Sequence, residues 1–341
     1  MDTTGALDEA LDRIHASGPE RLGWLTNHAP MAVEALVRHG QSGTVHRWLD
    51  RYRDNLEEMP SRHTPVTGGN WREALGDPAR IADWADYFER ETAERPWREV
   101  LAEWWPRLLP GIAGGATHPV IRTGHAVRTL LTTEETVPRN VELAHALGYW
   151  AARHAPLGEL RTLAAEPSAA VALDAVAAVP DQSGGIEYRL EQLTAFPGWP
   201  PGPGADAAAG PDEARDRLRE LVAAATHRYA THGHGEPVML VHAATAPNAV
   251  LRVLPALPRE LWPASLGAAW AASAAVTAAY APAAPAAYTP VRSTPEEIFE
   301  RAAAHGDDHT IKFTDTALDV GDGIALAAAV RSIELNTPFL S

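Results

Sequence analysis

Apolar residues in this chain recur at three- and four-residue intervals, and the strict alternation that marks a half-buried strand is nearly absent. The clearest case is the stretch 77–109, whose large apolar side chains follow helical spacing: Trp84, Tyr87, Phe88, Trp97, Trp104, Trp105 and Leu108. This spacing predicts a pair of helices that face a core. We therefore expect the 341-residue chain to be all-α, with many helices in a bundle-like arrangement and few strands.

Proline and glycine mark where several of these helices begin and end. Pro30 stands at the start and Gly40 past the end of a predicted helix over residues 31–39. The other expected helices cover residues 6–15, 44–58, 118–131, 138–154, 167–178, 212–230, 238–254 and 261–280.

A strong helix start lies near the C-terminal end of the sequence. Thr294 is the predicted N-cap, Pro295 takes the first helical position and Glu297 the third. We expect this helix to end near His305-Gly306, and Asp308 to cap a following helix that begins at His309.

The best internal boundary is the stretch 196–211, which is rich in proline, glycine and alanine. We interpret the chain as a single helical domain over residues 1–341, in two lobes of about 1–196 and 212–341 that this loop separates.

Composition excludes several classes of protein. The net charge of −15 argues against a nucleic-acid partner and against an anionic membrane surface. Without cysteine, the chain has no disulfide, thiolate zinc site or cysteine nucleophile. The uncharged stretch 261–291 is broken by prolines, so it predicts a buried helix and not a membrane span. No signal peptide is recognisable after Met1, and we expect a cytoplasmic protein.

Lys312 is the only lysine among 29 basic residues. Arginine keeps its charge almost everywhere, whereas lysine can be neutralised when buried. A neutral lysine can act as a base or nucleophile, or it can add carbon dioxide and become a carbamate, which binds metal as a carboxylate does. An ordinary exposed lysine, in a chain whose codon bias favours arginine, is the alternative at this point.

Fifteen histidines are present, and a few of them stand at helix starts. His28 comes just before the helix expected from residue 31, and His118 lies in the first turn of another helix. His125 follows His118 at seven residues, with Arg122 between them, so these three side chains share one helical face.

Two further histidines are expected to be buried or paired. His242 lies inside the apolar run 238–245, where an imidazole must be hydrogen-bonded or coordinated. His309 precedes Lys312 by three residues on one helix, so their side chains can converge. Imidazole is the commonest side-chain ligand of transition metals, and several such histidines together favour a joint site.

Short motifs spread over residues 20 to 335 resemble the signature blocks of the questin oxidase family. They are Asn27-His28-Ala29-Pro30-Met31, Leu108-Leu109-Pro110-Gly111, the run from Ala116 to Ala126, Val241-His242-Ala243-Ala244-Thr245-Ala246-Pro247 and His309-Thr310-Ile311-Lys312-Phe313-Thr314. The resemblance implies an all-helical fold and an oxygenase that opens a ring of an anthraquinone-like aromatic polyketide with O2. The ring opening would be Baeyer–Villiger-like or dioxygenase-like.

The resemblance also implies a metal site. The family's motifs carry over onto His28, His118, His242, His309 and Lys312, whereas His125 departs from the pattern of fungal members. Four imidazoles and one oxygen donor exceed the coordination of a tetrahedral zinc site, so Fe(II) fits best, with manganese or cobalt as lesser options. An ammonium cannot bind metal, but Lys312 as a carbamate could supply the anion.

Lys312, Arg122 and His125 are the predicted catalytic residues. Lys312 could alternatively hydrogen-bond a substrate phenolate, and Arg122 could pair with an acidic group of the substrate or with Glu142. Trp24, Trp71, Trp104 and Trp105 are candidates to line an aromatic substrate pocket. The sequence has no dinucleotide fingerprint, so NAD(P)H enters only as a diffusible reductant.

Three other functions stay open at the level of sequence. They are an NAD(P)H-dependent Baeyer–Villiger-type monooxygenase, a metal-dependent hydrolase and a non-catalytic helical protein that binds a polyketide. The chain is expected to act as a monomer or homodimer.

Overall fold

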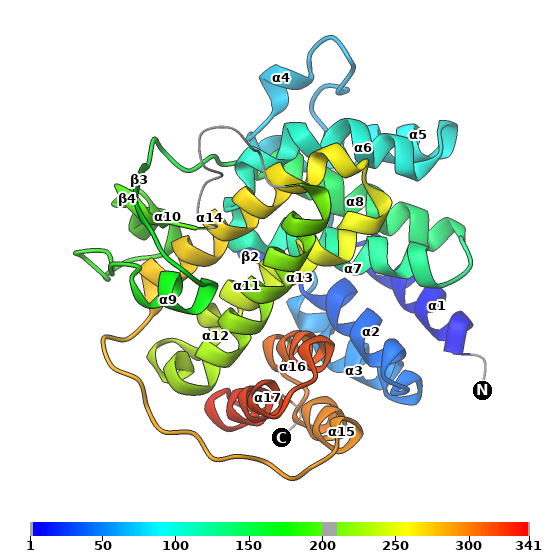
Figure 1. Cartoon of the computed structure of the whole chain (residues 1–341). Coiled ribbons are helices and arrows are strands. Elements are labelled where there is room, and N and C mark those ends of the chain that lie inside the picture. Colours follow the sequence, from blue (N-terminus) through cyan, green and yellow to red (C-terminus); the bar gives the residue numbers. More distant parts are fainter. Residues whose placement is uncertain (1–2, 200–209, 340–341) are drawn as a thin grey trace. The chain divides into compact units, whose positions relative to one another are not determined.

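The computed structural model describes residues 3–199 and 210–339, and Figure 1 shows its elements. Helices dominate these residues, and their strands form two separate two-stranded pairs, which confirms the all-α prediction. The chain divides into two compact units: Met1–Pro156 with Pro255–Leu257, and Leu157–Leu254 with Pro258–Ser341. The stretch 196–211, expected to separate two lobes, lies within the second unit, and its residues 200–209 are outside the described ranges.

The first unit is built from helices and one short hairpin. Its α-helices are α1 (Thr3–His15), α2 (Ala29–Arg38), α3 (Val45–Tyr52), α4 (Trp71–Ala74), α5 (Ile81–Glu94), α6 (Trp97–Leu108), α7 (His118–Thr132) and α8 (Val137–Ala152). The antiparallel strands β1 (Glu20–Arg21) and β2 (Leu25–Thr26) form the hairpin that leads into α2.

Helix α8 packs against α1, α5 and α7, and α7 packs against α2. Gly148 allows α8 to approach α5 closely, because a Cβ at this position would lie 3.0 Å from the backbone of Trp84 and Ala85 on α5. Beside this contact the buried Trp104 meets the rings of Trp84 and Phe88 edge-on, with ring centroids 5.4 and 5.0 Å away. The Asp77–Leu109 pattern therefore builds the aromatic core of the unit, as its spacing predicts.

The second unit contains α9 (Ala169–Asp174), α10 (Ile186–Leu190), α11 (Pro211–His232), α12 (Pro237–Leu240), α13 (His242–Val253), α14 (Trp262–Tyr280), α15 (Pro295–His305), α16 (Asp308–Val320) and α17 (Gly323–Leu335). Its strands β3 (Arg161–Ala165) and β4 (Ala195–Gly198) are parallel. The long helix α11 packs against α9, α13, α14, α16 and α17. Among the described helices, 237–256 alone has the length and hydropathy of a membrane span, and 72% of that window is buried.

Helix ends follow the predicted signals in α15 but not everywhere. Thr294 and Glu297 form a complete capping box, and the helix ends at Gly306 with φ of 79°. The predicted cap Asp308 is wrong by one residue: Asp307 is extended and accepts the Thr310 amide, so α16 begins at Asp308. The helices expected over 44–58 and 167–178 are shorter, and Val241 divides the one expected over 238–254 into α12 and α13.

Candidate metal centre

A strained turn positions His118 at the start of α7. Ala116 and Thr117 both have positive φ, 54° and 67°, which is costly for residues with a side chain. The turn brings the Gly115 carbonyl oxygen 2.7 Å from His118 Nδ1. Because a carbonyl only accepts, Nδ1 carries the proton and the lone pair lies on Nε2. Such strain is typical of functional sites, and here it orients an imidazole.

His28 lies against His118 in the same unit. The two rings stack with centroids 4.5 Å apart and planes inclined by 27°. His28 is the N-cap of α2, and its backbone N–H donates to the Tyr52 hydroxyl at 3.0 Å. Asn27 holds the backbone just before α2 in place, because its side chain accepts a hydrogen bond from the Ala29 N–H and donates one to the Gly18 carbonyl. The first unit therefore brings together two of the predicted ligands, from segments 90 residues apart.

The second unit contains a corresponding pair. The rings of His242 and His309 lie edge to face, with centroids 5.5 Å apart. His242 donates its Nδ1–H to the Met239 carbonyl at 2.9 Å, and His309 Nδ1 lies 2.8 Å from Asp308 Oδ1. The Met239 carbonyl has no proton to give, so the lone pair of the His242 ring lies on Nε2.

Lys312 follows His309 by one helical turn and is buried, with 1% of its surface exposed. Within the described residues its Nζ has no hydrogen-bond partner. Burial lowers the pKa of the Lys312 amine to about 8, although Asp308 and Asp307 oppose the change. Burying a charged amine without a hydrogen-bond partner costs free energy. The lower pKa favours the neutral amine, whose burial costs less.

The two predicted catalytic residues of α7 are held in buried ion pairs. Arg122 donates two hydrogen bonds of 2.6 and 2.7 Å to the Glu142 carboxylate, and His15 Nε2 lies 3.0 Å from the same carboxylate. Burial alone would raise the pKa of Glu142, but the charge of Arg122 outweighs it and lowers the pKa to about 2. Of the two sequence interpretations of Arg122, the structure shows the pairing with Glu142.

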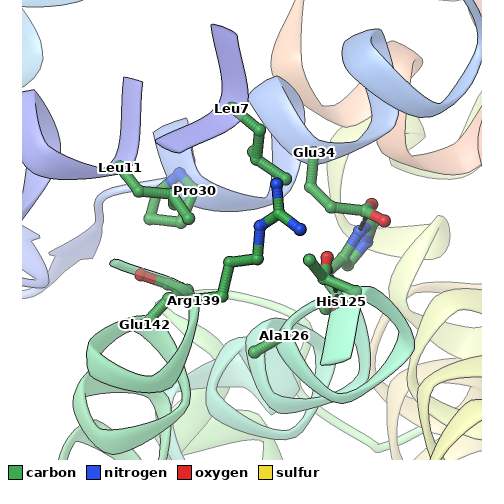
Figure 2. A pocket seen from close by; sticks show the side chains of 9 residues that line it. Leu7, Leu11, Pro30, Glu34, His125, Ala126, Arg139 and Glu142 are labelled. Atoms are coloured by element: carbon green, nitrogen blue, oxygen red, sulfur yellow. Dashed lines mark hydrogen bonds and ion pairs between the residues drawn. The ribbon is translucent and has the colours of Figure 1, made fainter. Parts of the chain in front are cut away.

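His125 has a similar environment. Its Nδ1 lies 2.7 Å from Glu34 Oε2, and Arg128 forms a bidentate pair with the same carboxylate. Figure 2 shows Glu34 and His125 pointing toward one another beside a cavity lined by α1, α2, α7 and α8. The cavity measures about 10 Å³, which is room for one water molecule and not for a polycyclic substrate. His125 thus lies beside a small cavity.

Sequence reasoning named Glu142 as a possible partner of Arg122, but it missed Glu34 and the place of Asp308 beside His309. Glu34 had a detectable signal, because it is the only charged residue in the apolar stretch Met31–Val37, and such a charge is paired when buried. Asp308 had no comparable signal, since acids are common in the first turn of a helix. The candidate tryptophans Trp104 and Trp105 are fully buried, and Trp24 is exposed.

The donors fit a nitrogen-rich transition-metal site. Imidazoles with Nδ1 held by a carbonyl or carboxylate present Nε2 lone pairs, which is the usual arrangement of histidine ligands. Imidazole suits iron, copper, nickel and zinc, and a carboxylate-like Lys312 would add the hard oxygen donor that iron accepts.

Comparison with known proteins agrees with the motifs. No curated protein matches the chain. A model of the family described as questin oxidase-like matches residues 25–133, about a third of the chain. The description of that family names an oxidase, which is a kind of oxidoreductase. The chain thus resembles the questin oxidase-like family over residues 25–133, the part that holds His28 and His118, and the match confirms the resemblance for the motifs in that range.

Proposed function

We propose that the protein is a non-haem iron-dependent oxygenase that opens a ring of an anthraquinone-like aromatic polyketide with O2. The observation that carries this proposal is the pair of adjacent imidazoles in each unit, of which His118 and His242 have a fixed tautomer, together with the buried Lys312 amine. The family match supports the oxygenase class. Iron and the ring-opening reaction are our extension of it.

The proposed iron ligands are His28, His118, His242 and His309, with Lys312 as a carbamate. When bound, Fe(II) supplies the one-electron chemistry that lets dioxygen react with an organic molecule. The four imidazoles would hold the metal, and their burial would limit the access of water to it. Carbamate formation joins the neutral amine to the carbon of CO2 and releases one proton, so the lowered pKa of Lys312 favours it.

Arg122 and His125 have a proposed positioning role. Their buried pairs with Glu142 and Glu34 tie α7 to α8 and α2. His118 starts α7, and His28 caps α2. The Arg122–Glu142 and His125–Glu34 pairs therefore hold in place α7 and α2, the helices at whose starts the stacked His118 and His28 rings lie.

The test of metal binding is elemental analysis of protein purified anaerobically and loaded with Fe(II). We expect about one iron per chain, and we expect His118→Ala and His242→Ala to lower the iron content sharply. The matched controls are His63→Ala and His234→Ala, which change exposed histidines of the first and second unit. A native protein that binds no iron would refute the proposal, and a full iron load in one of the two variants would assign the metal to the other pair alone.

Lys312 variants test the carbamate. If the oxygen donor matters, Lys312→Arg should lose iron as Lys312→Ala does, because a guanidinium cannot form the carbamate and keeps its charge. Lys312→Glu should retain part of the iron, since it brings a carboxylate. A Lys312→Arg protein with a normal iron load would contradict the ligand role.

Oxygen uptake separates the proposed reaction from its alternatives. With a hydroxylated anthraquinone as substrate, we expect uptake that does not require NAD(P)H. Uptake that starts only when NAD(P)H is added would indicate the Baeyer–Villiger-type monooxygenase, and turnover under strict anaerobic conditions would indicate a hydrolase.

A further inference from the structure

The groups beside Nδ1 differ in chemical kind among three of the candidate ligands. His118 and His242 each use a backbone carbonyl three residues earlier in the chain, from Gly115 and Met239. His309 instead lies beside the carboxylate of its neighbour, Asp308, at 2.8 Å. Among these three rings, His309 is therefore the one whose Nδ1 lies beside a charged side chain.

We propose that Asp308 is a positioning residue, which holds the proton of His309 on Nδ1 and directs the Nε2 lone pair to the metal. The inference rests on the proposed function, because it concerns the ion that we assign to this histidine. A carboxylate behind an imidazole fixes the tautomer and the ring orientation, and it strengthens the ring as a donor.

The local fold makes Asp308 available for this role. Asp307 takes the N-cap, and its Oδ1 accepts the Thr310 amide at 2.8 Å. Asp308 is thereby left at the first helical position, where the positive end of the α16 dipole stabilises a negative side chain. The Asp308 and His309 side chains are 16% and 13% exposed, so solvent screens their interaction only in part.

Asp307, Asp308 and His309 also offer ligand atoms within 4.8 Å of one another. A direct carboxylate ligand at Asp308 is therefore the competing role. Two substitutions separate the roles, because Asp308→Ala removes the acceptor and Asp308→Asn keeps an acceptor oxygen without the charge. Asp307→Ser is the matched control, since it removes one charge from the same turn but keeps a good N-cap.

Two measurements test these substitutions: the tautomer of His309 and the affinity for Fe(II). The first is 15N NMR of histidine-labelled, metal-free protein, with the His309 signals assigned by their loss in His309→Gln. The second is the Fe(II) affinity, measured by anaerobic calorimetry.

We expect Asp308→Ala to shift His309 from the Nδ1–H tautomer toward Nε2–H, and to weaken Fe(II) binding roughly 10-fold or more. Asp308→Asn should keep the native tautomer and lose several-fold less affinity than Asp308→Ala. Asp307→Ser should match the native protein in both measurements.

Two results would overturn the inference. One is an Asp308→Ala protein with the native tautomer and native affinity. The other is an Asp308→Asn protein that keeps the tautomer but loses as much affinity as Asp308→Ala, which would make Asp308 a ligand. If the native protein binds no Fe(II), the proposed function fails, and the tautomer in metal-free protein alone decides the role of Asp308.

Discussion

Replacing Lys312 with methionine should stabilise the metal-free protein at neutral pH. The amine is 1% exposed and has no hydrogen-bond partner among the described residues. Burial lowers its pKa from 10.5 to about 8, against the opposing charges of Asp308 and Asp307. At about 1.4 kcal/mol per pKa unit, this change corresponds to ~3 kcal/mol of unfavourable free energy for the charged form in the folded state.

The sign of the pH dependence follows from the two pKa values. Below pH 8 the lysine is charged in both states, so the folded protein bears the full cost of the buried charge. Between about 8 and 10.5 the unfolded chain still binds the proton that the folded chain has lost, so the stability of the native protein rises with pH. Lys312→Met has no such titration and should be more stable by up to ~3 kcal/mol at pH 7, an advantage that shrinks toward pH 10.5.

The assay is urea unfolding, followed by far-UV circular dichroism at pH 7, 9 and 10.5. The buffers contain a chelator and are free of CO2, so that neither metal nor carbamate forms. Lys312→Arg is the control, because its fixed charge should give a less stable protein without a titration in this range. A methionine variant that is no more stable than the native protein at pH 7, or whose advantage is the same at pH 10.5, would refute the reasoning.

Two other substitutions test the packing of the first unit. Glu142→Gln should cost about 3–5 kcal/mol at pH 7, because it leaves Arg122 buried without its counter-charge. The stability that ionised Glu142 contributes is present above pH 4.5 and is lost as the pH falls toward its folded pKa of about 2. Urea unfolding at pH 7 and 3 should therefore show that the free energy of unfolding falls less in the variant than in the native protein. An equal fall in both proteins would contradict the pairing. Gly148→Ala should cost about 1–3 kcal/mol, because its methyl group meets the α5 backbone at 3.0 Å. Gly267→Ala, in open space on α14, should instead stabilise by up to ~1 kcal/mol, and equal effects of the two alanines in thermal unfolding would contradict this account of Gly148.

Much of the fold could be predicted from local signals. The capping box of α15 and Gly306 depend on neighbouring residues alone, so the sequence specifies them. The parallel pair of β3 and β4 could not be predicted, because its register joins Arg161 to Ala195 and β3 is exposed along its length. Such pairing depends on tertiary contacts that leave no period in the sequence.

The candidate site shows the same division. Residue type and helix position were enough to select the histidines, which the structure brings together as one pair in each unit. Glu142 could be named as a possible partner of Arg122, whereas the pairing of His125 with Glu34 joins residues 91 positions apart and could not be predicted from a local pattern. The N-cap is Asp307 and not Asp308, a difference of one residue. With Asp307 as the cap, the Asp308 carboxylate lies beside His309.

Labelled oxygen tests the central claim most directly. Iron-loaded protein should convert a hydroxylated anthraquinone under 18O2 into a ring-opened product that carries 18O, as detected by mass spectrometry. Chelator-treated protein should be inactive, and added Fe(II) should restore it. A ring-opened product that forms without O2, carries no 18O under 18O2, or forms equally fast with metal-free protein would contradict an iron-dependent oxygenase.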